Sequence, residues 1–404
     1  MREIVLIKVS GEDRPGITSQ VMGILGEYNV RVLDISQAVV QDSLTLGILA
    51  EIPPDHRTAP VFKDLLYGAD RLGVKVKFSP VSEERYGQWA EAPGAARFIV
   101  TMLAREITAD NVARLAGILA ENGLNIESIN RLSDRAPLSG DGALSRACIE
   151  MAVRGEAGDQ PGLRRRFLDL SLETGVDIAF QEDDMFRRNR RLVALDMDST
   201  LINAEFIDEL AKAHGVGDEV SSVTEAAMRG ELDFRESLLK RVGLLAGMKA
   251  ETMERVAREV ELTEGARRLI KNLKAQGYKI AILSGGFTYI GERLQRELGI
   301  DFLHANTLEI EDGKLTGNLV GEIVDARMKA ELLKRIAERE GLYLSQVVAV
   351  GDGANDLAML EIAGLGIAFH AKPKVKEGAE QSISSIGLDG ILYLLGMRDR
   401  EALP

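Results

Sequence analysis

Two aspartates close a short apolar run near the middle of the chain. The run, RLVALDMDST at residues 191–200, places Asp196 and Asp198 where a strand opens into a loop. Two carboxylates so close shift each other's pKa, and a nucleophile beside an acid/base and a divalent metal makes use of both. The alternative is an Asp-rich turn that caps a helix beginning near Ile202. The first interpretation predicts a buried strand with a reactive carboxyl end.

A second apolar strand also ends in groups that can receive an anion. YKIAILSGG ends at Ser284, Gly285 and Gly286, a hydroxyl and flexible backbone N–H groups, although an ordinary glycine turn fits the same letters. Further on, Lys329 opens the helix KAELLKRIAERE. A lysine in that position is more often a solvated charge than a ligand, and its place in the series is what favours a functional role.

A third strand completes the series. VVAVGDGANDLAML carries Asp352, Asn355 and Asp356, hard oxygen ligands of the kind that Mg²⁺ takes. The order DxDST, SGG, Lys and GDGxND resembles the four motifs of the haloacid-dehalogenase superfamily of aspartate-nucleophile phosphatases. AEFIDELAKAHG and AAMRGELDFRESLLKRVGLL, after the first motif, look like the cap of the phosphoserine phosphatase family. The resemblance covers about residues 185–396.

The resemblance implies a two-step reaction. Asp196 is expected to be the nucleophile that becomes an aspartyl phosphate, and Asp198 the acid and then the base. Mg²⁺ is the expected cofactor, bound by Asp196, the backbone carbonyl of Asp198, and Asp352. The implied fold is a Rossmann-like parallel α/β core with an inserted helical cap at about residues 204–262, and a hairpin is expected around the Asp-Gly pair of residues 304–321.

The resemblance also implies which residues hold the phosphoryl group and which residues support them. Ser284, Gly285 and Lys329 are expected to hold the phosphoryl oxygens. Asn355 is expected to contact the phosphate or orient the water. Asp356 is expected to anchor Lys329 or to complete the outer metal shell.

The amino-acid part of a substrate needs other residues, which the cap resemblance supplies. Glu205 is expected to bind the ammonium, and Arg241 the carboxylate, because a guanidinium fork suits a carboxylate. From spacing alone Arg241 reads as a surface charge on an amphipathic helix. Met228 and Phe234 are expected to close over the substrate, although both also suit the core of a small helical cap.

The first half of the chain contains two similar units. Each predicts the order βαββαβ, a ferredoxin-like pattern with an antiparallel sheet, and the pair resembles the amino-acid-sensing ACT domain. We call them the first ACT unit, residues 1–82, and the second ACT unit, residues 95–183, ahead of a phosphatase part at residues 185–396. The expected segments are 3–16, 16–30, 31–40, 44–52, 59–73 and 74–81, then 97–106, 108–123, 125–133, 143–155, 161–175 and 176–184.

One turn in the first ACT unit suits a ligand. GEDRPG, from Gly11 to Gly16, resembles the strand-to-helix turn of the module, where backbone N–H groups can receive a carboxylate and Asp13 an ammonium; a plain Pro-Gly turn is the alternative. Serine is a plausible allosteric ligand. The second ACT unit has LAREITAD and lacks Pro-Gly, which favours a role in packing or in forming a homodimer.

Composition narrows the class of protein. A net charge of −13 and a pI near 5.1 disfavour a nucleic-acid partner. No apolar run suits a membrane helix, and the lone Cys148 reads as core, so a cytoplasmic enzyme is expected. A polar linker is expected at residues 82–96, and the arginine cluster of residues 187–191 reads as a solvated or acid-paired linker.

These features together predict Mg²⁺-dependent hydrolysis of O-phosphoserine to serine and phosphate, the last step of serine biosynthesis. Two alternatives remain open. One is a related phosphatase that acts on another small phosphomonoester or on phosphoserine in proteins. The other is an amino-acid-sensing regulator without turnover, against which the intact pair Asp196 and Asp198 argues.

Overall fold

The structure is a computed structural model that describes residues 3–53, 58–90, 96–135 and 146–404, without the side chain of Met228. The chain forms two compact units, residues 1–95 and 96–404. No helix among the described residues is long and apolar enough to cross a membrane.

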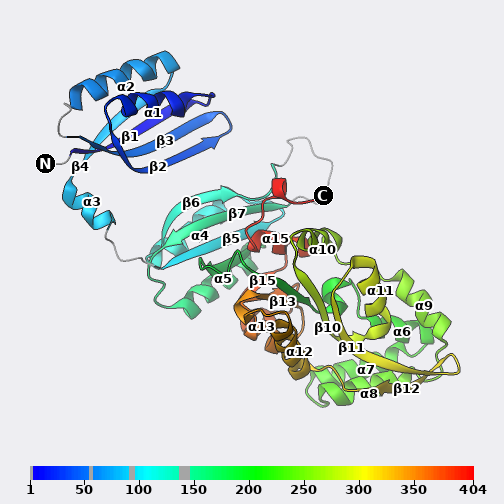
Figure 1. Cartoon of the computed structure of the whole chain (residues 1–404). Helices are drawn as coiled ribbons and strands as arrows, with labels where there is room; N and C mark the ends of the chain where they lie inside the picture. Colours follow the sequence, from blue (N-terminus) through cyan, green and yellow to red (C-terminus); the bar gives the residue numbers. More distant parts are fainter. Residues whose placement is uncertain (1–2, 54–57, 91–95, 136–145) are drawn as a thin grey trace. The chain divides into compact units, whose positions relative to one another are not determined.

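The first compact unit holds the first ACT unit, and its ferredoxin-like prediction is confirmed. Its four antiparallel strands lie in the order β2-β3-β1-β4, with two helices packed on the sheet (Figure 1). Alternate residues of β3 are buried, as expected for a strand with one face on a core. The elements are β1 Glu3–Glu12, α1 Ile17–Glu27, β2 Arg31–Val40, β3 Ser43–Ile52, α2 Thr58–Leu72 and β4 Lys75–Val81.

The expected linker contains a helix. Helix α3, Glu83–Ala90, follows Ser82, whose hydroxyl accepts from the Arg85 N–H (3.2 Å) as an N-terminal cap. The sequence pattern did not predict this helix, because it is polar and none of its side chains is buried against a core. Residues 91–95 of the expected linker lie outside the described residues.

The second ACT unit repeats the topology inside the second compact unit. Its strands lie in the order β6-β7-β5-β8, which confirms the second βαββαβ prediction, and Cys148 is a buried core residue of β7. The first residues of the predicted strand 143–155 lie outside the described residues. The elements are β5 Arg97–Ala104, α4 Ala109–Glu121, β6 Asn125–Arg131, β7 Ala147–Arg154, α5 Gln160–Thr174 and β8 Asp177–Glu182.

A seven-stranded sheet forms the centre of the phosphatase part, in the order β12-β11-β10-β9-β13-β14-β15 (Figure 1). Its middle strand β9, Leu192–Leu195, is buried on both faces, and its side chains alternate between two cores covered by helices. All neighbours pair in parallel except β11 and β12, which form the expected hairpin at Asp312-Gly313. The other strands are β10 Lys279–Phe287, β11 Phe302–Glu311, β12 Lys314–Val320, β13 Val347–Gly351, β14 Leu365–Phe369 and β15 Gln381–Ile383.

Helices cover the sheet and form a separate cap. Ile202 does not begin a helix as the turn alternative expected: it pairs with Leu262 in an antiparallel bridge, and the first cap helix begins at Phe206. The cap helices are α6 Phe206–His214, α7 Gly217–Met228, α8 Phe234–Leu244 and α9 Ala250–Glu259. The covering helices are α10 Ala266–Ala275, α11 Thr288–Leu298, α12 Ala326–Arg339, α13 Leu357–Ile362, α14 Pro373–Gly378 and α15 Ile391–Leu394.

The second ACT unit is joined to the phosphatase part by buried polar contacts. The Gln381 side chain donates to the Phe180 carbonyl (2.7 Å) and accepts from its N–H (2.8 Å), linking the edge strands β15 and β8. The arginine cluster contributes to this junction, where the acid-paired alternative is confirmed at Arg187 and the solvated alternative is wrong. Arg187 is fully buried in an ion pair with Glu150, and buried Arg190 donates to the Gly364 carbonyl (2.8 Å).

Candidate active site

Three neighbouring strands bring the sequence motifs to one edge of the sheet. Strand β9 pairs in parallel with β10 on one side and β13 on the other, so their carboxyl ends lie together. Asp196 follows β9, Ser284 lies near the carboxyl end of β10, and Asp352 follows β13. The Asp196 N–H donates to the Val350 carbonyl (2.9 Å), which fixes its height on the sheet.

A buried lysine joins two of the carboxylates. Lys329, in the first turn of α12, has 0% exposure, and its Nζ lies 2.9 Å from Asp196 Oδ1 and 2.6 Å from Asp356 Oδ1. Burial alone lowers the pKa of Lys329, but the charges of the two aspartates outweigh it and raise the pKa above its usual value. The Gly353 N–H donates to the other oxygen of Asp356 (2.9 Å). Lys329 therefore stays charged and holds Asp196 in place.

Asp198 lies in a tight turn after Asp196. The Phe206 N–H, at the start of the first cap helix, donates to Asp198 Oδ1 (2.9 Å). A side chain at Gly286 would begin 2.1 Å from Asp198 Oδ2, so only glycine leaves room for this carboxyl group. Burial raises the pKa of Asp198 well above its usual range, and the charges of Glu205 and Asp196 add to this effect. A carboxyl group held in its acid form can donate a proton.

The donor set suits a divalent cation. One carboxylate oxygen from each of Asp196, Asp352 and Asp356 lies within 4.8 Å of the others, and only oxygen atoms are offered, as Mg²⁺ prefers. Thr200 donates its hydroxyl to Asp352 Oδ1 (3.1 Å). Burial, followed by the charges of Asp196 and Asp356, raises the pKa of Asp352 to about 7. Carboxylates that repel each other in this way gain from a cation placed between them.

The Ser284 turn is built to present backbone N–H groups. The Gly286 N–H donates to Ser284 Oγ (2.9 Å), which leaves the hydroxyl hydrogen free to donate. The buried Asn306 side chain donates to the Gly285 carbonyl (2.7 Å) and accepts from the Val324 N–H (2.9 Å), which orients the turn. The Phe234 ring of the cap lies over Gly285, because a side chain there would begin 3.0 Å from its Cζ.

The cap side of the site carries charges without strong partners. Arg241 on α8 is half-buried; its Nε donates weakly to the Ser237 carbonyl (3.4 Å), and it forms no ion pair in the described part of the chain. Burial lowers the pKa of Arg241, and the charges of Asp208, Glu205 and Asp198 oppose that shift. Its guanidinium therefore feels the charge of these three carboxylates without forming an ion pair with any of them among the described residues.

Glu205 precedes α6 and accepts from the Ser199 hydroxyl (2.8 Å). The residue as a whole is exposed, but partial withdrawal of its carboxyl group from water raises its pKa, and the charges of Asp196 and Asp208 add to the shift. Met228 ends α7, and its side chain lies outside the described ones.

Not every predicted residue joins the cluster. The Asn355 side chain folds back over Gly353, where a Cβ would lie 2.2 Å from Asn355 Oδ1. Gly11, Asp13 and Gly16 lie in the other compact unit. In that turn, Gly16 has φ 95° and precedes α1 without a side-chain cap, so the first N–H groups of the helix remain open to a ligand.

Four contributors were missed by sequence reasoning. Ser199 and Thr200 lie inside the DMDST motif, so their hydroxyls could have been included as supports for Glu205 and Asp352. Asp208 has one buried oxygen without a hydrogen-bond partner among the described residues, and its charge acts on Arg241. Asn306 follows no local pattern, and no signal in one sequence marks it.

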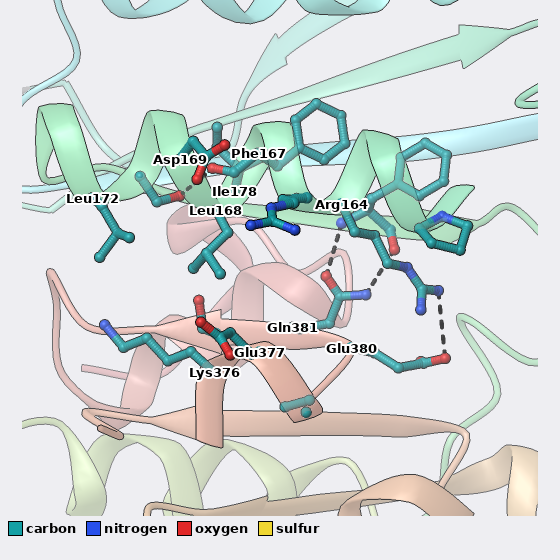
Figure 2. A pocket seen from close by; sticks show the side chains of 17 residues that line it. Arg164, Phe167, Leu168, Asp169, Leu172, Ile178, Lys376, Glu377, Glu380 and Gln381 are labelled. Carbon is teal, nitrogen blue, oxygen red and sulfur yellow. Dashed lines mark hydrogen bonds and ion pairs between the residues drawn. The ribbon is translucent and has the colours of Figure 1, made fainter. Parts of the chain in front are cut away.

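A groove of about 500 Å³ lies elsewhere, between α5 and residues 376–382 (Figure 2). Leu168 and Leu172 form part of its wall, and Arg164 reaches Glu380 across it (3.5 Å). None of the predicted site residues lines it. This groove separates the second ACT unit from the phosphatase sheet and is not the site of the carboxylates.

Three family models match successive parts of the chain. The haloacid dehalogenase-like hydrolase family matches residues 190–364. ACT domain families match residues 3–79 and 96–181. The expected combination of a hydrolase domain with two ACT domains is confirmed.

Relatives match along nearly the whole chain. A phosphoserine phosphatase of Streptomyces coelicolor is 44% identical over 98% of this chain and 93% of its own length. Phosphoserine phosphatase SerB2 of Mycobacterium tuberculosis is 40% identical over 97% of this chain and 93% of its own length. A solved structure of a probable phosphoserine phosphatase from Vibrio cholerae is 36% identical with a TM-score of 0.59, and covers 74% of this chain and 86% of that chain.

Proposed function

The chain belongs to the phosphoserine phosphatase family, and from that premise we propose that it hydrolyses O-phospho-L-serine to L-serine and phosphate, the last step of serine biosynthesis. The observation that carries this choice of substrate is Arg241, a half-buried guanidinium above the catalytic edge that forms no ion pair in the described chain. A buried cation without a counter-ion is costly, and a substrate carboxylate supplies one.

The first chemical step uses the two aspartates of the first motif. An Asp196 carboxylate oxygen attacks phosphorus, forming a bond from that oxygen to phosphorus, and the bond from phosphorus to the seryl oxygen breaks. Asp198, whose pKa is raised by burial, gives a proton to the departing seryl oxygen. Serine leaves with a neutral hydroxyl.

The second step reverses the role of Asp198. Its carboxylate takes a proton from a water molecule, whose oxygen attacks phosphorus as the bond to Asp196 breaks. Lys329, held between Asp196 and Asp356, and the Ser284 turn face the phosphoryl oxygens and stabilise their charge in both steps. Inorganic phosphate leaves, and Asp196 returns to its starting form.

The oxygen donors at the carboxyl edge fit Mg²⁺. Asp196, the backbone carbonyl of Asp198, and Asp352 are the residues proposed to hold it, with Asp356 near enough to complete the outer shell. When bound, Mg²⁺ supplies positive charge that lets an anionic carboxylate approach a phosphate dianion. Thr200 keeps Asp352 turned toward the cluster by donating to one of its oxygens.

The cap is proposed to recognise the amino-acid part and to exclude water. Arg241 pairs with the carboxylate and Glu205 with the ammonium, while Phe234 covers the phosphoryl turn at Gly285. With these roles, free phosphoserine is expected to be favoured over phosphoserine inside a protein, where both the carboxylate and the ammonium are lost to peptide bonds.

The test is phosphate release from L-phosphoserine with Mg²⁺, next to a panel of other phosphomonoesters and an EDTA control. Strong preference for phosphoserine and loss of activity in EDTA are expected. Activity on other esters alone would favour a phosphatase of different substrate, and no activity with any ester would favour a regulator without turnover.

We also propose that the first ACT unit binds an amino acid, with serine as the candidate, at the turn from Gly11 to Gly16. The open N-terminus of α1 suits the carboxylate, and Asp13, exposed in the same turn, suits the ammonium. The ACT matches support this assignment. Serine is expected to change turnover of the intact chain, which steady-state kinetics with and without serine tests. A homodimer is expected in solution, and sedimentation tests that expectation.

A further inference from the structure

We propose that Arg105 of the second ACT unit is a positioning residue that fixes the base of the cap hinge. By doing so it sets the fraction of enzyme molecules whose cap can close over phosphoserine. The proposal rests on the proposed function, because cap closure over an amino-acid substrate is what gives the hinge its role. It gives the second ACT unit a part in catalysis without a ligand of its own.

The hinge consists of two short connections that run side by side. The Asn203 N–H donates to the Glu261 carbonyl (3.0 Å), and the Thr263 N–H donates to the Leu201 carbonyl (3.0 Å), on either side of the bridge between residues 202 and 262. All four cap helices lie between these connections in the chain. A rigid-body movement of the cap must therefore be absorbed by the backbone of these few residues.

Glu264 is the residue at which the returning connection enters the core, and it is held at both ends. Arg105 Nη1 and Nη2 donate to Glu264 Oε1 (2.7 Å) and Oε2 (2.5 Å), a bidentate pair. The Glu264 carbonyl accepts from the Leu388 N–H (2.8 Å). Glu264 directly follows Thr263, so these contacts hold the chain immediately after the hinge.

The next residue is clamped as well. Gly265 has φ 78°, and a Cβ there would lie 2.3 Å from Asp389 Oδ1, so the backbone rests directly on that carboxylate. Asp389, buried, accepts from Arg268 of α10 (3.0 Å) and from Arg146 of the second ACT unit. The second ACT unit therefore supplies two guanidinium groups to the hinge base, Arg105 to Glu264 and Arg146 to Asp389.

The turn that carries Arg105 is closed to a ligand. It corresponds to the GEDRPG turn of the first ACT unit, but here Thr108 and Asn111 cap α4 reciprocally: Thr108 Oγ1 accepts from the Asn111 N–H (3.2 Å), and Asn111 Oδ1 accepts from the Thr108 N–H (2.9 Å). Arg105 is turned outward to the phosphatase part. The Glu264 carboxylate thus contacts the second ACT unit at the turn equivalent to the one at which the first ACT unit is proposed to bind a ligand carboxylate.

Loss of the Arg105–Glu264 pair is expected to change the fraction of molecules whose cap can close, rather than the free energy of unfolding. Both side chains of the pair are 36% exposed, and ion pairs so exposed add little to folding. Without the pair, the hinge base samples more positions and a smaller fraction of caps can close productively, which raises the apparent dissociation constant of a substrate that the cap must hold. A substrate held by the core alone is unaffected.

The experiment compares Arg105→Ala with Arg164→Ala in the full chain. Arg164 and Glu380 form a pair across the same junction, with similar exposure of 39% and 47%, but they line the groove of Figure 2, whose lining includes no hinge residue. For R105A we expect KM for phosphoserine to rise about 3- to 10-fold, kcat to change less than about 2-fold, and both constants for 4-nitrophenyl phosphate to stay within about 2-fold. R164A should match the parent chain throughout.

Two further measurements keep the proposal open to refutation. The reversed pair R105E with E264R should recover at least half of the lost affinity for phosphoserine. Hydrogen exchange at the Asn203 and Thr263 amides should be faster in R105A and unchanged in R164A. Unchanged exchange and KM in R105A, or equal changes in R164A, would overturn the proposal. If the parent chain does not hydrolyse phosphoserine, the proposed function fails, and the exchange rates still decide whether Arg105 fixes the hinge.

Discussion

The core half and the cap half of the active site differ in how their charges are satisfied. In the core, fully buried Lys329 is bonded to Asp196 and Asp356 before any substrate is present. In the cap, Arg241 forms no ion pair among the described residues, and Glu205 is paired only with a hydroxyl. The difference indicates that folding builds the machinery for phosphoryl transfer, whereas the machinery for selecting the substrate is completed by the substrate.

The largest expected effect breaks the core half. Asp196→Asn removes the nucleophile, because an amide cannot form the phosphorylated intermediate, and turnover of phosphoserine and of 4-nitrophenyl phosphate should both fall by at least about 10³-fold. Circular dichroism should show an unchanged fold, since Asn keeps the size of the side chain. Full activity of this variant would show that Asp196 is not the nucleophile.

A second core change should affect stability as well as activity. Lys329→Met leaves the two aspartates buried without their cation, which should lower the free energy of unfolding by about 3–5 kcal/mol and turnover of both substrates by about 100-fold. Urea unfolding and steady-state kinetics measure the two effects. A matched change of exposed Lys334 on the same helix, Lys334→Met, should do neither, and equal destabilisation by both variants would contradict the account.

The third change separates the cap from the core. Arg241→Ala should lower kcat/KM for phosphoserine by about 10- to 100-fold, because it removes a charge-assisted pair with the carboxylate. Hydrolysis of 4-nitrophenyl phosphate, which has no carboxylate, should change by less than about 2-fold. The neighbouring Lys240→Ala, on the exposed side of α8, is the control. Equal losses with both substrates would remove the carboxylate role of Arg241.

The smallest effect tests a core support. Asn306→Ala removes the side chain that joins the Gly285 carbonyl to the Val324 N–H, so the turn at Ser284 should become less well oriented. We expect turnover of both substrates to fall by about 5- to 10-fold and to the same extent. A loss confined to phosphoserine would place Asn306 with the cap rather than with the core.

The core half could be predicted almost entirely from the sequence. Parallel strands place their carboxyl ends at one edge, so apolar runs that end at Asp196, Ser284 and Asp352 were enough to bring these residues together. The βαββαβ order of the expected segments likewise predicted both ACT units. Local patterns sufficed because each motif lies on its own element.

Contacts between distant segments account for what was wrong or missed. Ile202 is held extended by Leu262 and not in a helix, and the partner lies 60 positions away in the chain. The sequence left Arg187 as either solvated or acid-paired, and only the tertiary fold identifies Glu150 of the second ACT unit as its partner. Asn306 acts by bonding two backbone groups of other segments, and no sequence pattern in its own strand indicates this role. Such pairings depend on the tertiary fold.

The most direct test of the central claim compares L-phosphoserine with phosphoethanolamine, which keeps the phosphate and the ammonium but lacks the carboxylate. With Mg²⁺ present, the parent chain should prefer phosphoserine by about 100-fold in kcat/KM, and Arg241→Ala should reduce that preference to within about 5-fold. Equal use of the two esters by the parent chain would contradict the claim that the cap selects the substrate through its carboxylate.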